Sequence, residues 1–345
     1  MISKQSSLAV RVYRNHHLRF VLFGLLLATM PYLATWGVIR VSILTTVAAV
    51  LIYSVAALGL NLLLGYSGLV SLGAAGFMGL GAYLAGFVIR EMDMTIWVAI
   101  IVALAIPTVL GILVGLVSLR IAGIYLAIAT LCVSEILLKT FEEVEAFTGG
   151  MRGMTIRFPV IFGLQMNRET MFLVLVVALV LTMMLTHNLV NGQFGRAMHA
   201  MRGSESAAQA MGVNLLKYRL MVFALSTAYA GLAGALYVFF IRASFPTTWG
   251  VTLSLNLVAV IVIGGMRSIY GTVIGAFVVW GMSDLVLKEL PIIGDMIGVP
   301  FIVTGILIVV MLLFYPQGLS HIPKDIKARV RRFRKRGDAH VRSDT

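Results

Sequence analysis

Long apolar runs separated by short polar pieces dominate the sequence. Runs long enough to cross about 30 Å of hydrocarbon as helices lie at 20–38, 41–64, 69–89, 96–119, 170–188 and 220–241. Shorter runs, or runs interrupted by glycine and polar residues, lie at 121–138, 253–263, 271–287 and 299–314. The pattern predicts an all-α, polytopic transmembrane protein with about ten membrane segments, some of them re-entrant or broken at glycines.

Composition supports the membrane assignment. Of the 345 residues, 60% are hydrophobic and only 12% are charged, which is more apolar material than a soluble domain of this size can bury. The net charge of +13 comes from tails and loops between apolar runs, not from a basic patch interleaved with aromatic residues. Nucleic-acid binding is therefore not expected.

The charge distribution predicts an orientation. If the N-terminus is cytosolic and each segment crosses, the inner pieces hold 19 Lys and Arg residues and the outer pieces hold eight. This bias favours an N-in, C-in topology. The expected parts are a cytosolic basic N-tail (1–19), a transmembrane permease domain (20–315) with an outer loop (139–169) and a cytosolic coupling loop (189–219), and a cytosolic basic C-tail (316–345) that contacts anionic lipid headgroups.

The central loop contains a predicted short helix, from Ser204 to Met211. Ser204 is a suitable N-cap, and Gly212 is a helix stop. Between them lie residues that suit the first turn or favour helix, namely Glu205, Ser206, Ala207 and Ala208. A two-turn helix at the cytosolic face, next to Arg196 and Arg202, predicts a docking element for a separate cytosolic partner.

Small residues are concentrated within two membrane regions, 65–86 and 264–281. Steps such as Gly111 with Gly115, and Gly271 with Gly275, predict close helix packing. The turn-type sequences "GYSG" and "GGMRS" predict helix breaks, which are tolerated at membrane depth only where they are buried or line a water-filled path. Candidates for the translocation path are therefore Gly65, Tyr66, Ser67, Gly68, Gly264 and Gly265.

Few other polar groups lie within the predicted spans. Glu135 needs a partner or a cavity, and an ion pair with Lys139 one helical turn away is the alternative to a substrate contact. Asn61 and Asn256 are either substrate contacts or hydrogen-bonding groups between helices. Glu135, Asn61 and Asn256 are therefore all candidates for the translocation path.

The sequence lacks the common motifs for nucleotide binding, hydrolysis and metal binding. It has no G-x-x-x-x-G-K-[ST] loop for ATP, no H-E-x-x-H, no G-x-S-x-G and no His/Cys cluster with metal-ligand spacing. It also lacks chains of ionisable residues across the spans, which an ion-coupled transporter would need. We expect a channel-forming subunit that is not an enzyme, holds no metal or cofactor, and takes its energy from a partner.

Several blocks resemble the LivM-type permease of branched-chain amino acid ABC importers, within the family that transports hydrophobic amino acids, urea and amides. They are "GLNLLLGYSGLVSLGAAGFMGLGAY", "GIYLAIATLCVSEIL", "FTGGMRGM", "GRAMHAMRGSESAAQAMGVNLLKYRLMVFALSTAYAGLAGALY" and "GGMRSIYGTVIGA". Further path candidates within these blocks are Ser71, Gly73, Phe77 and Thr130. The resemblance runs in order from about residue 44 to residue 314.

The resemblance implies a set of partners. These are a second, related permease, two ATPase subunits that bind ATP and Mg²⁺, and an extracytoplasmic solute-binding protein, all assembled at the bacterial inner membrane. It also implies that the segment from Ser204 to Met211 is the coupling helix that fits a groove on an ATPase.

Four positions depart from the pattern of this family. Leu69 and Ala74 replace polar residues, while Arg267 and Thr272 stand where a glycine and a proline are usual. The expected cargo is a branched-chain amino acid. Urea or short amides, another amino acid and a more apolar carboxylate are the alternatives, and an ion-coupled secondary transporter is a lower one.

Overall fold

The computed structural model describes residues 16–37, 40–92, 94–117, 123–161 and 164–282, together with residues 302, 305–306, 309–310, 313 and 318–319. Most of the predicted segment 299–314, most of the N-tail and nearly all of the C-tail lie outside the described residues. The described part is mainly helical, as expected, with strands of only two residues each.

The first half of the chain forms the helices α2 to α7. Their bounds are α2 His16–Ala28, α3 Met30–Thr35, α4 Val41–Asn61, α5 Ala74–Arg90, α6 Ile96–Val117 and α7 Ile124–Glu143. The π-helical turn η1 (Leu62–Tyr66) continues α4 without interruption. Pro31 lies in the first turn of α3, where its missing N–H needs no partner, and the predicted first span is thereby divided into two helices.

A short irregular region then leads to the second half. It contains α8 (Glu145–Thr148), the 3₁₀ turn η2 (Gly150–Arg152), β1 (Met154–Thr155), β2 (Val160–Ile161) and β3 (Leu164–Gln165). The remaining elements are α9 (Arg168–Asn191), α10 (Gln193–Gly203), α11 (Glu205–Ala210), α12 (Leu215–Ile241), β4 (Ala243–Ser244), η3 (Pro246–Trp249), α13 (Val251–Gly264), α14 (Ile269–Ala276) and η4 (Phe277–Gly281).

Within the described residues, seven helices are long and apolar enough to cross a membrane. Two shorter apolar helices, Ala74–Arg90 and Ile269–Gly281, occupy predicted segments 69–89 and 271–287. Seven predicted segments thus have a helix of full spanning length and two have a shorter apolar helix, while the count of about ten membrane segments and the N-in, C-in orientation stay predictions.

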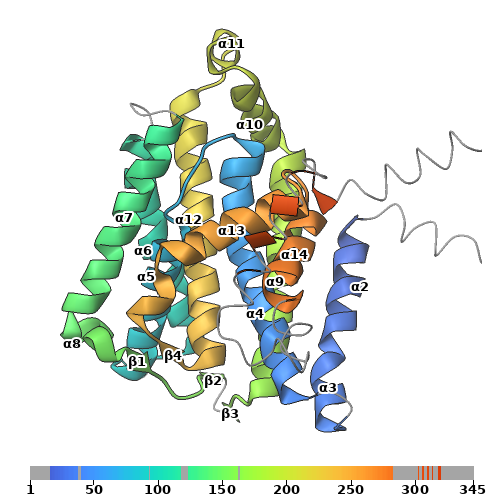
Figure 1. Cartoon of the computed structure of the whole chain (residues 1–345), viewed down its shortest axis with the longest axis vertical. Helices are drawn as coiled ribbons and strands as arrows, with labels where there is room; N and C mark the ends of the chain where they lie inside the picture. The colour runs from blue at the N-terminus through green and yellow to red at the C-terminus, as the bar shows by residue number, and fades with distance from the viewer. Residues whose placement is uncertain are drawn as a thin grey trace, which may run out of the picture.

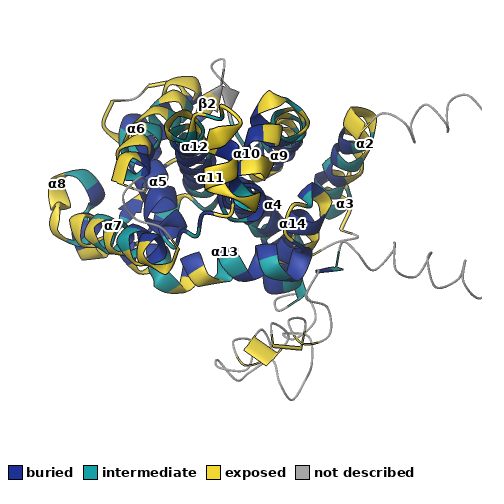
Figure 2. Ribbon diagram, turned by 90° about the horizontal axis from the view of Figure 1, so that it is seen from above, coloured by how far each residue is buried: buried dark blue, intermediate teal, exposed yellow. Residues whose placement is uncertain are grey.

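The long helices stand side by side, and the two ends of the molecule differ (Figure 1). α10 and α11 project at one end, while α8 and the short strands lie at the other. There β1 pairs with β4 and β2 with β3, both antiparallel. Figure 2 shows buried residues concentrated on α4 and α5 and exposed residues along the outer helices α2 and α6. Exposed apolar side chains such as Leu26 and Ile101 suit a lipid-facing surface.

Glycines allow α12 to pack at backbone distance against its neighbours. A Cβ atom on Gly234 would lie 1.8 Å from the carbonyl oxygen of Met78 in α5, and one on Gly81 would lie 2.2 Å from that of Gly231. The close packing predicted for Gly111 is confirmed, since a Cβ there would lie 2.0 Å from the hydroxyl of Thr227. Side chains at these glycines would force the central helices apart.

Two helix boundaries differ from the predicted ones for local reasons. α12 begins at Leu215, five residues before the predicted start, because the Asn214 side chain accepts a hydrogen bond from the backbone N–H of Lys217, at 3.0 Å. The N-cap thus starts the helix before the apolar run begins. α5 begins at Ala74, since the chain from Leu69 to Gly73 is not helical.

Candidate functional site

The predicted short helix in the central loop is present. α11 spans Glu205–Ala210, and the Ser204 hydroxyl accepts a hydrogen bond from the backbone N–H of Ala207 at 3.3 Å, as an N-cap does. Gly212 adopts a φ of +83°, a conformation that glycine tolerates best and that ends the helix. The predicted cap and stop are therefore confirmed.

An ion pair that the sequence did not reveal anchors α11. Glu205 pairs with Arg219 of α12, fourteen positions further along the chain. The side chain of Arg219 is only 6% exposed, whereas that of Glu205 is 45% exposed. A buried guanidinium needs a partner, so this pair fixes α11 against the start of α12.

We expect Glu205→Ala to loosen α11, because the substitution leaves the buried Arg219 side chain without its carboxylate partner. Limited proteolysis should cut the chain between residues 203 and 213 faster than in the wild type. The double variant with Arg219→Met should recover part of the protection, since it also removes the buried charge. Equal cleavage of the wild type and Glu205→Ala would contradict an anchoring role.

The proposed coupling residues differ in exposure. Ala207, Ser206 and Gly212 are exposed, and Met211 is 85% exposed, so these residues form the free surface of the projecting loop. Ala208 is buried within the chain. A bulky residue at position 208 would disturb the packing of α11 itself, and exposed positions are therefore the appropriate probes of docking.

α10 connects this loop to the interior and was not predicted as a separate helix. Phe194, Ala197, Met198 and Met201 are buried and recur at i, i+3, i+4 and i+7, which is a helical signal present in the sequence. On its inner side the guanidinium of Arg202 lies 3.5 Å from the carbonyl oxygen of Leu64. α10 therefore rests directly on η1.

Arg202 also touches the second predicted break. Its Nη2 atom lies 3.9 Å from the sulfur of Met266, in the turn between α13 and α14. The neighbouring ring of His199 packs edge-on against that of Tyr66, with ring centroids 5.7 Å apart. One face of α10 thus contacts both interrupted helices.

The two interruptions, which lie about 200 residues apart in the sequence, meet each other. The Asn61 amide nitrogen donates to the hydroxyl of Thr272 at 2.8 Å, and its oxygen accepts from the backbone N–H of Arg267 at 3.2 Å. The Tyr66 hydroxyl donates to the carbonyl oxygen of Arg267 at 2.7 Å. Gly65 leaves space for this contact, because a Cβ atom there would lie 1.8 Å from the Asn61 oxygen.

In the family that this sequence resembles, glycine is usual at the position of Arg267. Its φ is +64°, so the backbone keeps the left-handed conformation that glycine favours although the residue carries a side chain. Its Nε atom lies 3.4 Å from the carbonyl oxygen of Gly65. Gly265 in the same turn has a φ of +106°, and Gly264 lies against the backbone of Gly271.

Hydroxyl groups from α7, from α13 and from the segment just before α5 accept hydrogen bonds from the buried backbone N–H groups at the start of α5. Thr130 of α7 accepts from the backbone N–H of Leu72, and Ser134 of α7 accepts from that of Gly76, each at 3.0 Å. The hydroxyl of Ser254 in α13 accepts from the N–H of Ala75, and that of Ser71 from the N–H of Gly73. These bonds replace the water that the first N–H groups of an exposed helix would use.

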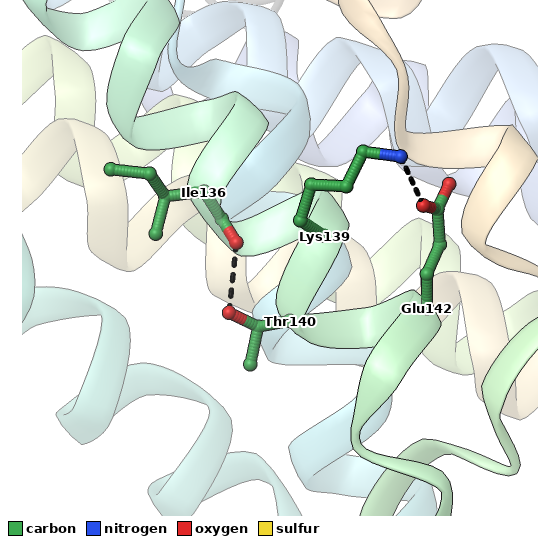
Figure 3. A network of polar contacts seen from close by, with 4 residues as sticks. All are labelled: Ile136, Lys139, Thr140 and Glu142. Atoms are coloured by element: carbon green, nitrogen blue, oxygen red, sulfur yellow. Dashed lines mark hydrogen bonds and ion pairs between the residues drawn. The ribbon is translucent and has the colours of Figure 1, made fainter.

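The remaining path candidates lie near this region or away from it. Phe77 and Ser67 are buried, and Gly68 packs against the Arg202 side chain. Asn256 and Glu135 are half-buried. The alternative ion pair of Glu135 with Lys139 is wrong, because Lys139 reaches forward to Glu142 at 2.5 Å (Figure 3).

The electrostatics at the inner side of α10 are those of a cationic cluster. Burial, the charge of Arg267 and the charge of Arg202 lower the pKa of His199. Burial and the charge of Arg267 lower the pKa of Arg202. In the described part of the chain, no group of three His, Cys, Asp or Glu side chains is arranged to hold a metal ion.

We expect Asn61→Leu to destabilise the contact between the two breaks by about 1–3 kcal/mol, since it leaves the part-buried N–H of Arg267 and the buried hydroxyl of Thr272 without that partner. Thermal unfolding in detergent would measure the change. Asn256→Leu is the matched control, because Asn256 lies on a different helix and takes no part in the contact. A similar shift for both variants would contradict the assignment.

The comparisons with known proteins agree with the resemblance. The family model of the branched-chain amino acid transport system permease component matches residues 42–316. The LivM permease protein of the high-affinity branched-chain amino acid transport system of Salmonella typhimurium is 29% identical over 316 residues, covering 84% of this chain and 71% of that protein. Its Escherichia coli counterpart matches with the same identity and coverage.

A probable LivH permease of Methanocaldococcus jannaschii is 29% identical over 238 residues, 64% of this chain and 74% of that protein. No solved structure matches this chain. Because the family model covers most of the sequence, and seven helices of the described part are able to span a membrane, the chain belongs to the family of branched-chain amino acid transport permeases.

Proposed function

We propose that this chain is a permease subunit of an ATP-driven importer of branched-chain, hydrophobic amino acids in the bacterial cytoplasmic membrane. It forms half of the translocation path beside a second, related permease. Two cytosolic ATPase subunits, which bind ATP and Mg²⁺, drive it, and an extracytoplasmic solute-binding protein delivers the cargo. The family match and the names of the relatives support this proposal.

The contact of α10 with both helix breaks is the observation that carries the mechanism. α11 projects beyond the helix bundle (Figure 1), and its exposed residues are free to dock on an ATPase. Arg202 extends from α10 to Leu64 on one side and Met266 on the other. A displacement of α11 therefore moves the residues that surround the breaks, without any need for ATP chemistry in this chain.

The broken helices supply the part of the path that moves. Asn61 at the end of α4 and Tyr66 at the end of η1 form hydrogen bonds with Thr272 and with the backbone of Arg267, and these bonds join the two interrupted helices. Gly65, Gly264 and Gly265 give the backbone the freedom to change. We assign the inner gate to this junction.

Reconstitution tests the proposal. Proteoliposomes containing this chain, its permease partner and both ATPases should accumulate radiolabelled leucine only when ATP and the solute-binding protein are present. Omitting the ATPases should abolish accumulation. Uptake by this chain alone under a Na⁺ or H⁺ gradient would refute the proposal and support the ion-coupled alternative.

A further inference from the structure

The end of η1 gathers positive charge from two distant parts of the chain. Arg202 comes from α10 and Arg267 from the turn before α14, yet their guanidinium groups lie by the adjacent carbonyl oxygens of Leu64 and Gly65. His199 lies one turn before Arg202 on α10, with its ring against Tyr66. We refer to His199, Arg202 and Arg267 as the inner cationic cluster.

Among the described residues, no carboxylate forms an ion pair with an arginine of this cluster. In the described residues, ion pairs are formed by Arg90, Lys139 and Arg219, and neither Arg202 nor Arg267 shares one of them. Burial and the positive charge of Arg267 both lower the pKa of Arg202, and the second effect is that of two like charges that repel each other. Two like charges held side by side favour a bound anion between them.

The carbonyl groups at the end of η1 use only some of the N–H donors that the two arginines carry. A guanidinium carries five N–H donors. The contacts of Arg267 within the described residues use its Nε at 3.4 Å, and those of Arg202 reach one carbonyl at 3.5 Å and one sulfur at 3.9 Å. These are long contacts, and they leave donors available. Arg267 and His199 are exposed, so a small solute can reach them.

We propose that the inner cationic cluster is an oxyanion-binding site at the inner end of the translocation path, and that its ligand is a carboxylate or phosphate group. Arg267 supplies the planar fork of donors, Arg202 the second charge, and His199 a further N–H donor. The assignment of the transported solute's carboxylate as the physiological ligand rests on the proposed function. A lipid phosphate is the other source of the same chemistry.

Anion-dependent unfolding of the full chain in phosphatidylcholine nanodiscs tests the site without any transport partner. The thermal midpoint would be followed against isovalerate and, separately, inorganic phosphate, each replacing chloride at constant ionic strength. We expect a saturable rise for the wild type. Arg267→Gly should weaken the apparent affinity at least tenfold, and it suits the backbone because glycine favours a φ of +64°.

Two further variants complete the design. Arg202→Met keeps most of the apolar stem, removes the second charge and should weaken binding in the same way. Arg196→Met removes an exposed arginine from the same helix and should leave binding unchanged. The proposal fails if neither anion stabilises the wild type more than chloride, or if Arg267→Gly and Arg202→Met respond as the wild type does.

Nanodiscs with phosphatidylglycerol distinguish the two sources. In one outcome, the thermal midpoint without added anion is higher than in phosphatidylcholine and no longer rises with isovalerate or phosphate. This result supports the site and assigns its ligand to a lipid headgroup. A retained response supports the site and assigns it to a soluble solute. Because the readout is binding, it is independent of the reconstitution test, and either proposal can fail without the other.

Discussion

Gly234→Ala lowers the free energy of unfolding by about 3 kcal/mol, the upper end of the usual cost of overpacking. The added methyl group would lie 1.8 Å from the carbonyl oxygen of Met78, which belongs to the rigid backbone of α5. α12 must then move away from α5 and loosen the centre of the bundle. Thermal and denaturant unfolding of the purified chain would measure the loss.

Gly203→Ala is the matched control for this prediction. Nothing lies within 4 Å of a Cβ atom at Gly203, which is the last residue of α10. The same chemical change should there be neutral or slightly stabilising, since alanine favours a helix over glycine by about 1 kcal/mol. Equal effects at the two positions would show that α12 and α5 are not packed at backbone distance.

Met211→Glu reduces ATP-driven uptake at least tenfold while leaving the thermal midpoint unchanged. Met211 is 85% exposed beside α11, so its replacement would remove an apolar contact with the proposed ATPase partner and no packing within this chain. Uptake in proteoliposomes and copurification of the ATPases would be measured together. Both should fall.

The control substitution is Met151→Glu. Met151 is also exposed, at 66%, but it belongs to η2, between α8 and β1, and these two elements lie at the opposite end of the molecule from α11 (Figure 1). Copurification of the ATPases should therefore remain at the wild-type level. Normal uptake and normal ATPase association in Met211→Glu would refute the docking role of the α11 loop.

Several features of the site were accessible from local sequence. Ser204 and Gly212 set the limits of α11 because a hydroxyl cap and a left-handed stop act within a few residues. The glycine-rich breaks were located for the same reason. The helical spacing of apolar residues in α10 was equally local, but this helix was not predicted, because the glycines and charged residues of the segment are also typical of a loop.

Long-range pairings were not accessible in this way. The sequence placed Glu135 one turn from Lys139, yet Lys139 pairs with Glu142, because neighbours three and four residues away compete for one cation. The partners Glu205 and Arg219 lie fourteen positions apart, and no helical period joins them across the loop.

The sequence by itself determined that this chain is a helical membrane protein, where most of its apolar helices lie and where two of them break, because burial in lipid imposes long apolar runs and turn-type residues interrupt them. Only the tertiary structure decided that the two breaks meet through Asn61 and that Arg202 and Arg267 converge on η1. These contacts join residues as much as about 200 positions apart, and they depend on how close neighbouring helices approach. The packing of glycine backbones against each other sets that distance.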